Sequence, residues 1–465
     1  MTLNTTTDTI VALSTPQGIG AIGVIRISGL QAFDICNKIF KTKSSKQKNF
    51  YNVRSHTIHF GTIQNDEVII DEVLVSIFKT PHSYTSENTV EISCHGSPFI
   101  QQQLIQLIIK HGARIANQGE FTLRAFLNGK MDLSQAEAVA DLISSNSASA
   151  HQIAMQQMRG GFSSKIKLLR QNLIDFASLI ELELDFSEED VEFADRNDLK
   201  NLVNSIQRIV QRLIDSFEVG NVIKNGIPVA IVGKPNAGKS TLLNALLNED
   251  KAIVSHIPGT TRDVIEDELT IDGILFRIID TAGIRETFDI IESIGVEKTF
   301  EQIKLSAIVL YIFDIHEVTA AELQLIIEEI KPHLHNSELV LVGNKIDHED
   351  KEYALQEFED FNNILFISAK EQTNLDQLKK HLVHLFDNRT VNITETIVTN
   401  ARHVEALRNT NTSLVKVLEG LHNNVTGDFL AMDIRQALHY LGTITGEISS
   451  DDLLSNIFSR FCIGK

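Results

Sequence analysis

The sequence predicts a multidomain protein that combines α/β and all-α parts. We expect an N-terminal α+β domain, a helical domain made of two separate stretches of chain, and a doubly wound α/β domain inserted between those stretches. Three observations support this prediction. The chain has 465 residues and 43% apolar content, which is enough for about three domains with packed cores. Its first part is rich in short β-branched runs, and its apolar residues then change to helical spacing. Strand-loop-helix patterns interrupt that helical spacing before it returns near the end.

The N-terminal domain is predicted from short β-branched runs that Gly, Pro and Asn interrupt. Examples are Ile22–Ile27, Val68–Ile70 and Val73–Ile77. Runs of this length and composition are typical of strands, so we place an α+β domain at residues 1–120.

The helical domain is predicted from apolar residues spaced three and four apart on both sides of the inserted domain. Ser134–Glu137 has the pattern of a capping box and marks a helix start. We place this domain at 121–222 and 389–465, around an inserted domain at 223–388. The residues on the predicted apolar faces are Ile166, Leu169, Leu173, Phe176, Ile180 and Leu184, then Leu202, Ile206, Ile209 and Leu213, and finally Leu430, Ile434, Leu438, Leu441, Leu453, Leu454 and Phe458.

The inserted domain contains a phosphate-binding pattern, G-K-P-N-A-G-K-S, at Gly233–Ser240. The apolar run Val229–Val232 precedes it and a predicted helix, Thr241–Leu247, follows it, which is the setting such a loop requires. Backbone N–H groups would hold phosphate oxygens, Lys239 would neutralise their charge and Ser240 would bind Mg²⁺. The alternative is a glycine-rich turn without function, and the flanking strand and helix favour the nucleotide site.

Three further motifs follow apolar strands and indicate which nucleotide is bound. Asp280–Gly283 places a carboxylate beside the magnesium and an N–H near the terminal phosphate. Asn344–Asp347 provides a carboxylate, Asp347, that suits the ring N–H and amino group of guanine, and adenine lacks that pair of donors. Ser368–Lys370 would offer the N–H of Ala369 to the guanine oxygen. A fourth segment, Gly259–Asp263, lies between the phosphate loop and Asp280 and supplies Thr261 for magnesium. The ordered set predicts a GTP site.

Ile284 follows Asp280–Gly283, so the side chain that orients water in Ras-like enzymes is absent. At this point the domain resembles the bacterial TrmE-Era type of Ras-like G domain, and most closely the MnmE (TrmE) family of tRNA wobble-uridine modification GTPases. That resemblance implies a potassium ion in place of an arginine finger, bound by Asn236, Ser255, Thr260 and the carbonyl of Ile257. It also implies that two G domains dimerise for hydrolysis and that Glu292 orients the water. A solvated surface charge is the alternative for Glu292.

The nucleotide-binding residues assigned from the motifs and the resemblance belong to five segments of the inserted domain. They are Asn236, Ala237, Gly238, Lys239, Ser240, Thr241, Ser255, His256, Ile257, Pro258, Gly259, Thr260, Thr261, Asp280, Thr281, Ala282, Gly283, Asn344, Lys345, Asp347, Ser368, Ala369 and Lys370.

Charge and cysteine content limit the remaining functions. The net charge of −19 opposes nucleic-acid binding over the whole surface. A tRNA partner therefore requires either a local basic patch, with Lys165, Lys167 and Arg170 as candidates, or a second protein that carries most of the charge. We favour the second route. The odd number of cysteines, three, argues against a disulfide framework. The sequence has no secretory signal and no apolar run long enough for a membrane span, so we expect a cytoplasmic protein.

The final five residues, Phe461–Lys465, match the terminus of the MnmE family. The resemblance makes Cys462 a candidate for the catalytic thiol, on a mobile tail where Lys465 could lower its pKa. A buried or idle thiol is the alternative.

The resemblance also implies a folate site in the N-terminal domain. Arg26, Glu91, Lys130 and Lys465 fall on the family's contacts to a formyl- or methylene-tetrahydrofolate. A carboxylate would pair with the pterin donors and the cations would meet the glutamate tail, whereas a surface ion pair is the alternative for each residue. Thr85–Asn88 departs from the family's Thr-Gly-Glu-Asp, because Ser86 replaces a glycine that has free φ.

The resemblance as a whole implies a potassium-dependent GTPase that uses a folate one-carbon unit to modify the wobble uridine of certain tRNAs at carbon five. It implies a homodimer through the N-terminal domain and a partner of the FAD-dependent MnmG type. Two alternatives stay open at this point. A ribosome-assembly GTPase would share the G-domain motifs but would usually carry a basic RNA-binding module. In the other alternative, a folate enzyme would hold GTP only as a structural ligand.

Overall fold

A computed structural model describes most of the chain, in two compact units. Unit 1 comprises residues 1–143, 156–207 and 406–465, and unit 2 comprises 144–155 and 208–405. No helix within the described part of the chain is long and apolar enough to cross a membrane. The described residues are 8–42, 49–185, 196–249, 267–279, 300–334, 337–348, 351–361, 363–387, 396–423, 425–459 and 461–464.

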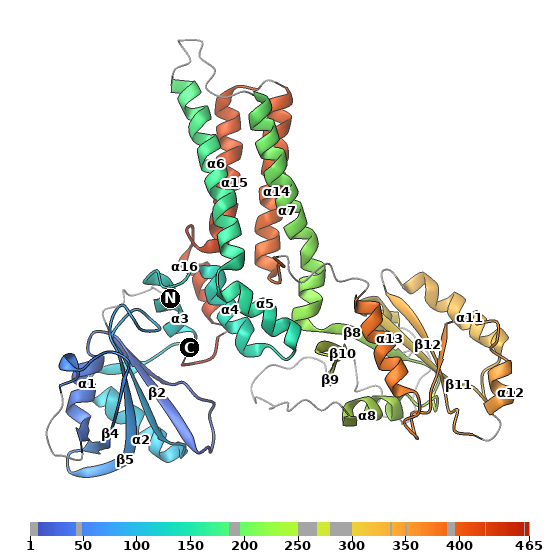
Figure 1. The fold of residues 1–465 in the computed structure, drawn as a ribbon, viewed down its shortest axis with the longest axis horizontal. Helices are drawn as coiled ribbons and strands as arrows, with labels where there is room; N and C mark the ends of the chain where they lie inside the picture. Colours follow the sequence, from blue (N-terminus) through green and yellow to red (C-terminus); the bar gives the residue numbers. More distant parts are fainter. Residues whose placement is uncertain are drawn as a thin grey trace. The chain divides into compact units, whose positions relative to one another are not determined.

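Unit 1 begins with a mixed sheet of strand order β3-β4-β5-β6-β2-β1-β7, shown in blue in Figure 1. Helices α1 and α2 pack on one of its faces over a core that includes Ile25, Val75, Ile92 and Leu104. The predicted α+β class of this part is therefore confirmed. The elements are β1 (Thr9–Leu13), β2 (Ile22–Ser28), α1 (Ala32–Ile39), β3 (Phe40–Thr42), the 3₁₀ turn η1 (Phe50–Asn52), β4 (Thr57–Asn65), β5 (Val68–Phe78), β6 (Thr89–His95), α2 (Pro98–Lys110) and β7 (Ala113–Ile115).

One strand prediction in this sheet was wrong in its bounds. The separate runs at 68–70 and 73–77 form the single strand β5. A shift in its pairing with β4 occurs between Ile63 and Gln64, and such a bulge lets a strand continue past an irregular point. Polar residues at 71 and 72 therefore interrupt the apolar pattern without ending the strand.

The helical part of unit 1 packs α6 against α15, with the first part of α7 and the second part of α14 alongside (Figure 1). The chain enters these helices before the inserted domain and returns to them after it, as predicted. The helices of this part of the chain, of which α5, α7 and α14 lie partly in unit 2, are α3 (Glu120–Leu127), α4 (Leu133–Ser144), α5 (Ala148–Met158), α6 (Gly161–Asp185), α7 (Arg196–Asn225), α14 (Ala401–His422), α15 (Gly427–Thr445) and α16 (Asp451–Phe458).

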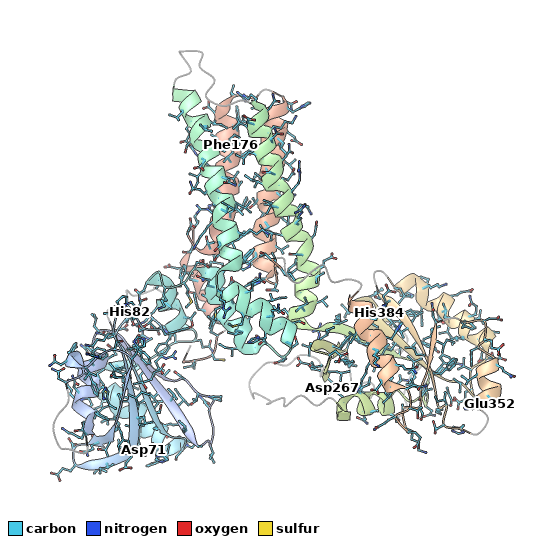
Figure 2. All side chains as sticks on the ribbon, viewed as in Figure 1. Asp71, His82, Phe176, Asp267, Glu352 and His384 are labelled. Carbon is cyan, nitrogen blue, oxygen red and sulfur yellow. The ribbon has the colours of Figure 1, made fainter. Side chains whose placement is uncertain are left out.

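The apolar stripes of these helices were largely predicted. Ile166, Leu169, Leu173, Phe176 and Ile180 are all buried on α6, and Phe176 is labelled among the long helices in Figure 2. Leu184, the sixth residue predicted for this face, lies outside the described side chains. On α7 the prediction was partly wrong: Ile206 and Leu213 are buried, Leu202 and Ile209 are only half-buried, and Leu199, Val203 and Val210 complete the buried face.

The capping box of α4 was predicted two residues too late. The Asp132 carboxylate accepts hydrogen bonds from the Gln135 backbone N–H at 3.1 Å and from the Ser134 hydroxyl at 2.8 Å. In return, Gln135 Oε1 accepts from the Asp132 backbone N–H at 3.0 Å. Asp132 is thus the residue that caps the helix, and this reciprocal pair satisfies two backbone N–H groups, those of Asp132 and Gln135.

Unit 2 contains a sheet of order β13-β12-β11-β8-β10-β9, in which only β9 is antiparallel to its neighbour. This is the predicted doubly wound arrangement, because the strand order reverses beside β8. The elements are β8 (Ile227–Val232), α8 (Lys239–Glu249), β9 (Asp267–Ile271), β10 (Ile274–Ile278), β11 (Ile308–Asp314), α11 (Ala320–Ile330), η3 (Lys331–His333), β12 (Glu338–Asn344), α12 (Lys351–Gln356), β13 (Ile364–Phe366) and α13 (Leu375–Asp387).

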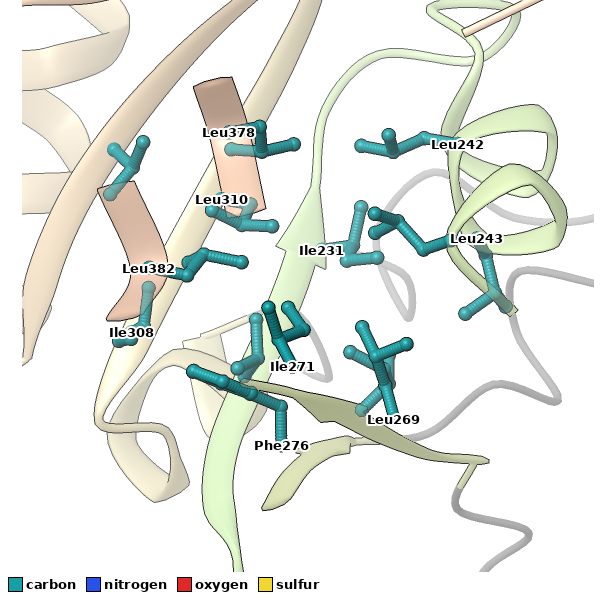
Figure 3. Close-up of a cluster of buried hydrophobic side chains, with 14 of the residues drawn as sticks. Ile231, Leu242, Leu243, Leu269, Ile271, Phe276, Ile308, Leu310, Leu378 and Leu382 are labelled. Atoms are coloured by element: carbon teal, nitrogen blue, oxygen red, sulfur yellow. The ribbon is translucent and has the colours of Figure 1, made fainter. Parts of the chain in front are cut away.

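Both faces of this sheet are buried, which explains why its strands are continuous apolar runs. Along β8, Val229 and Ile231 face one cluster, which includes Leu242 of α8 and Leu378 of α13 (Figure 3). Ala230 and Val232 face the opposite cluster, with Leu323 and other residues of α11. Because β8, β11, β12 and β13 run parallel, their carboxyl ends share one edge of the sheet.

Candidate functional site

The predicted phosphate loop connects β8 to α8 at the switch point of the sheet. Asn236 has a φ of 62° and Gly238 a φ of 99°, so the loop depends on left-handed backbone at both residues. At Gly238 a Cβ atom would lie 2.2 Å from Nδ2 of Asn344, so a side chain there would require Asn344 or the loop to move. The second glycine of the motif is therefore required by the close approach of a base-recognition residue.

The Lys239 ammonium lies inside this loop. Its Nζ donates to the carbonyl oxygens of Gly233 at 2.7 Å and Lys234 at 2.9 Å. Burial lowers the pKa of Lys239, because the charged form loses hydration. A half-buried cation whose partners are carbonyl oxygens in this structure is suited to neutralise an anion held by the loop.

Asn344 connects the phosphate loop to the Ser368–Lys370 segment. It is buried at the end of β12, where its Nδ2 donates to the Ala237 carbonyl at 2.8 Å. Its Oδ1 accepts from the Ala369 backbone N–H at 3.0 Å. The Asn344 side chain therefore connects the phosphate loop, the end of β12 and the Ser368–Lys370 segment. The first and last of these segments lie more than a hundred residues apart in the sequence, and the motifs predicted that these strand ends would meet.

The Ala369 N–H, which the sequence assigns to the guanine oxygen, donates to Asn344 Oδ1 in this structure. The next N–H along the chain, that of Lys370, has no hydrogen-bond acceptor among the described residues. Asn344 takes the Ala369 donor because a buried N–H requires a partner.

The Asp347 carboxylate is exposed and accepts a 2.6 Å hydrogen bond from the Ser368 hydroxyl. This hydrogen bond lowers the pKa of Asp347, so the group is ionised at neutral pH. An ionised carboxylate at this edge of the sheet can accept from two N–H donors on a base, which is the role that the sequence predicts for Asp347. Ser368 itself is buried and held by paired backbone bonds to Thr373.

Several predicted nucleotide and metal ligands lie outside the described residues. They are Ser255, His256, Ile257, Pro258, Gly259, Thr260, Thr261, Asp280, Thr281, Ala282, Gly283 and Glu292.

In unit 1, two of the predicted folate contacts form an ion pair with each other. Arg26 on β2 and Glu91 on β6 are direct cross-strand partners. The Nε and Nη2 atoms of Arg26 both approach Oε1 of Glu91, at 2.9 and 2.8 Å. The guanidinium also lies over the rings of Tyr84, at 5.1 Å, and Phe121, at 5.6 Å. Among the described residues, Oε2 of Glu91 has no hydrogen-bond donor and stays available to a ligand N–H.

Lys130, the third predicted folate contact, lines a pocket of about 410 Å³ together with Tyr84, the ring beneath Arg26. The other lining residues are His56, Phe78, His82 and Ser83. The Ser83 hydroxyl is buried and has no hydrogen-bond partner among the described residues. The pocket thus combines aromatic walls, cationic or titratable groups and an unsatisfied hydroxyl, a lining suited to a flat ligand that carries carboxylates. Lys465 lies outside the described residues.

Serine at position 86 does not prevent the left-handed turn that glycine would allow. Ser86 has a φ of 61°. Its carbonyl accepts from the Thr80 hydroxyl at 2.7 Å, and the neighbouring Thr85 carbonyl accepts from Asn128 Nδ2 at 2.7 Å. These contacts hold the loop in a conformation that serine adopts only with strain.

The C-terminal segment is docked on unit 1, so the prediction of a mobile tail was wrong for residues 461–464. Phe461 is buried beside Phe458, and Ile463 pairs with Gln118. The Gly464 carbonyl accepts from the Ser14 hydroxyl at 3.3 Å. Apolar burial and backbone pairing fix the segment, yet the Cys462 side chain stays exposed. Cys36 and Cys94 are buried, and burial raises the pKa of both thiols.

Sequence reasoning missed Asp314, Tyr84 and Ser83. Asp314 ends β11 as Asn344 ends β12, and a lone carboxylate after a buried strand was the available signal. Tyr84 and Ser83 had no comparable signal, because only the fold brings them to Arg26 and Lys130.

The doubly wound sheet with a phosphate loop at its switch point is that of a P-loop nucleotide-binding protein, and the Asn-Lys-x-Asp segment narrows the class to guanine-nucleotide-binding proteins. Two family models match the chain, "GTP-binding protein TrmE N-terminus" at residues 9–130 and "MnmE helical domain" at residues 133–462. The chain belongs to the MnmE family of tRNA modification GTPases.

Full-length relatives support this assignment. The chain is 56% identical to the tRNA modification GTPase MnmE of Cytophaga hutchinsonii, over 100% of this chain and 99% of that protein. It is 56% identical to MnmE of Flavobacterium psychrophilum and 53% identical to MnmE of Bacteroides fragilis, each over 98% of this chain and 99% of the relative. A solved structure of Era with MgGDPNP and ribosomal RNA matches 40% of this chain and 66% of that chain at 26% identity, with a TM-score of 0.26, which is too low to support an inference.

Proposed function

We propose that the protein binds and hydrolyses GTP with Mg²⁺, and that this cycle drives modification of the wobble uridine of tRNA at carbon five. The observation that carries the proposal is the position of Asn344, which joins the phosphate loop to the Ser368–Lys370 segment in a chain that is related to MnmE over its full length. The Ser240 hydroxyl, at the start of α8, would bind Mg²⁺ together with Thr261. Mg²⁺ would offset the charge on the phosphates.

Two substitutions test the proposal in living cells, one at the exposed thiol and one at the nucleotide site. Wobble-uridine modification is measured in strains that carry Cys462→Ser or Asp280→Ala. Loss of modification in both strains is expected, because Cys462 is the exposed thiol and Asp280 would serve the nucleotide site. Full modification in both strains would contradict the proposal.

Potassium would assist hydrolysis at Asn236, with Ser255, Thr260 and the Ile257 carbonyl. Asn236 is exposed in the left-handed turn of the phosphate loop, and an amide oxygen there is a suitable ligand for a monovalent cation. Because the cation would stabilise charge that develops on the phosphates, GTP turnover is expected to be much faster in KCl than in NaCl. Equal rates in the two salts would remove potassium from the mechanism.

Glu292 would orient the attacking water, because Ile284 occupies the position that serves this purpose in Ras-like enzymes. Glu292→Ala should lower kcat by about 10²–10⁴-fold while GTP affinity is largely kept. A rate close to that of the unmodified protein would mean that Glu292 is a solvated surface charge.

Formyl- or methylene-tetrahydrofolate would bind at Arg26, Glu91, Lys130 and Lys465. The free Oε2 of Glu91 can accept from pterin N–H groups, and the pocket at Lys130 can take the aromatic and carboxylate parts of the ligand. Titration with formyl-tetrahydrofolate, followed by calorimetry, tests this. Glu91→Gln keeps the shape of the side chain but removes its charge, and an unchanged affinity would contradict the assignment.

A homodimer through the N-terminal domain would cover the outer face of its sheet. Ile58, Phe60 and Leu74 are exposed on the face opposite the core, and Phe60 and Leu74 are direct cross-strand partners. An exposed apolar face of this kind is commonly an interaction surface. Phe60→Glu should give a monomer in sedimentation experiments, whereas Leu325→Glu, at an exposed leucine of α11 in unit 2, should not.

The tRNA surface would come mainly from an FAD-dependent MnmG-type partner in the cytoplasm. Of the basic residues considered for a local patch, Lys167 pairs with Asp132 at 3.2 Å and Arg170 pairs with Glu447. Two of the three candidate charges therefore already have acidic partners, which favours the second protein. Filter binding of tRNA to the chain alone and to the chain with its flavoprotein distinguishes the two routes.

A further inference from the structure

An ion pair lies beside the base-recognition motif and is not explained by the proposed contacts. Asp314, at the end of β11, is buried, and its Oδ2 lies 2.5 Å from Nζ of Lys345. Asp314 and Asn344 are register partners on the parallel strands β11 and β12, so Lys345 is the first residue beyond that pairing. The pair therefore occupies the carboxyl edge of the sheet, where nucleotides bind in this class of fold.

The backbone of Lys345, like its side chain, is in contact with the turn that follows β11. Lys345 has a φ of 73°, a conformation that costs energy for a residue with a side chain and needs support from its surroundings. His316 supplies that support, because its Nε2 lies 3.3 Å from the Lys345 carbonyl and must donate to it. Oδ1 of Asp314 in turn accepts from the His316 backbone N–H at 3.0 Å. The turn that follows β11 thus contacts Lys345 at both ends of the residue.

This arrangement restricts where the stem of Lys345 can lie. The side chain of Lys345 is 31% exposed, whereas that of Asp314 is 6% exposed, so the ammonium contacts a buried carboxylate while about a third of the lysine side chain stays open to solvent. A lysine stem is an apolar strip, and Asp347, two residues along, is the carboxylate that would meet the edge of the base. A flat base whose edge contacts Asp347 would present its ring face to that strip.

We infer that Asp314 is a positioning residue for guanine recognition, which acts by holding Lys345 against the face of the base. The inference depends on the proposed GTP site. The alternative is that the pair only stabilises the edge of the sheet. The two explanations differ in what happens to ligand affinity when the protein stays folded.

The experiment compares dissociation constants for GDP and IDP in Asp314→Asn, which keeps the shape and the acceptor for His316 but removes the charge. Because GDP and IDP share the ring face and differ in the amino group that Asp347 would read, both affinities should fall by the same factor, about tenfold. Asp347→Ala should instead lower GDP affinity more than IDP affinity. Glu317→Gln, at an exposed carboxylate in the same turn, is the matched control and should change neither.

A double-mutant cycle with Lys345→Met tests whether Asp314 acts through the lysine. In the Lys345→Met background, Asp314→Asn should cause no further loss of affinity. Equal losses with and without the lysine, or unchanged GDP affinity in folded Asp314→Asn, would overturn the inference. Asp314→Glu, which keeps the charge but displaces it by one methylene, serves if the asparagine variant does not fold, and it should weaken GDP and IDP equally. Failure of the unmodified protein to bind GDP would remove the GTP site itself, whereas binding that ignores Asp314 would remove only this role.

Discussion

The nucleotide site of unit 2 and the candidate folate site of unit 1 are built in different ways. In unit 2, short continuous motifs lie at the ends of neighbouring strands, and a neutral amide, Asn344, joins them through backbone groups. In unit 1, single residues from separate elements meet, and Arg26 and Glu91 satisfy each other without a ligand. The first kind of site can be recognised from a sequence, while the second depends on strand pairing between distant segments.

The difference should be visible when one side chain is removed from each site. In unit 2 a substitution at Asn344 breaks a junction of three segments and leaves buried backbone groups without hydrogen-bond partners. In unit 1 it breaks one half-buried ion pair. We therefore expect the largest losses in unit 2.

Asn344→Ala should have the largest effect. It leaves the Ala237 carbonyl and the Ala369 N–H buried without partners, and each such group costs about 1–3 kcal/mol. Unfolding of unit 2 should occur at lower denaturant concentration, and GDP binding should fall by at least about a hundredfold, because roughly 2.7 kcal/mol corresponds to that factor. Gln324→Ala, at an exposed amide on α11, is the control. Normal GDP affinity in Asn344→Ala would show that the junction is dispensable.

Gly238→Ala should have the next largest effect. The added methyl group would lie 2.2 Å from Asn344 Nδ2, and the backbone would keep a φ of 99° only with strain. Strain of this kind costs about 1–3 kcal/mol, so GDP affinity should fall by roughly tenfold or more. Gly129→Ala, at a glycine with a similar φ of 70° but open space around it, isolates the contribution of the backbone from that of the collision. Equal stability losses in both variants would mean that the contact with Asn344 is unimportant.

Arg26→Ala should have a smaller effect, confined to unit 1. It leaves Glu91 without its cation and removes the guanidinium from Tyr84 and Phe121. We expect a loss of about 1–2 kcal/mol, between the values for exposed and buried pairs, and weaker binding of formyl-tetrahydrofolate. GDP affinity should not change. Arg26→Lys keeps the charge but not the fork of donors, so it should recover part of the stability. A larger stability loss than that of Asn344→Ala would reverse the comparison.

The smallest effect on stability should come from alkylation of the native protein, because the reagent reaches the exposed Cys462 thiol and not the buried thiols of Cys36 and Cys94. Cys462 is exposed, whereas burial raises the pKa of Cys94 to about 11, so at pH 8 only about one Cys94 thiol in a thousand is ionised. The thiolate is the reactive form, and its fraction at Cys94 increases as the pH rises towards 11. Mass spectrometry should show one modified cysteine in the native protein and three after unfolding. Rapid native reaction at Cys36 or Cys94 would contradict the burial of those thiols.

Much of the fold was predictable because the inserted domain and the helices carry periodic signals. The strand before the phosphate loop, the apolar face of α6 and the interruption of the helical domain were all predicted correctly. The strand β5 was predicted in two pieces, because composition does not reveal the bulge in its pairing with β4. The cap of α4 was predicted two residues late, because composition does not reveal the side-chain hydrogen bonds between Asp132 and Gln135. The predicted mobility of the C-terminal tail was wrong because its partners, Gln118 and Ser14, lie far away in the sequence.

By itself, the sequence determined the class of the inserted domain and the residue types that would recognise phosphate and guanine. Those motifs are local, and a strand followed by a loop and a helix places them without help from distant residues. Only the tertiary structure decided which groups are already engaged. The Ala369 N–H belongs to Asn344, Lys345 is held by Asp314, and Arg26 is paired with Glu91. The reason is physical: a buried polar group takes the nearest suitable partner in space, and strand pairing, which brings residues from remote parts of the chain together, determines that partner.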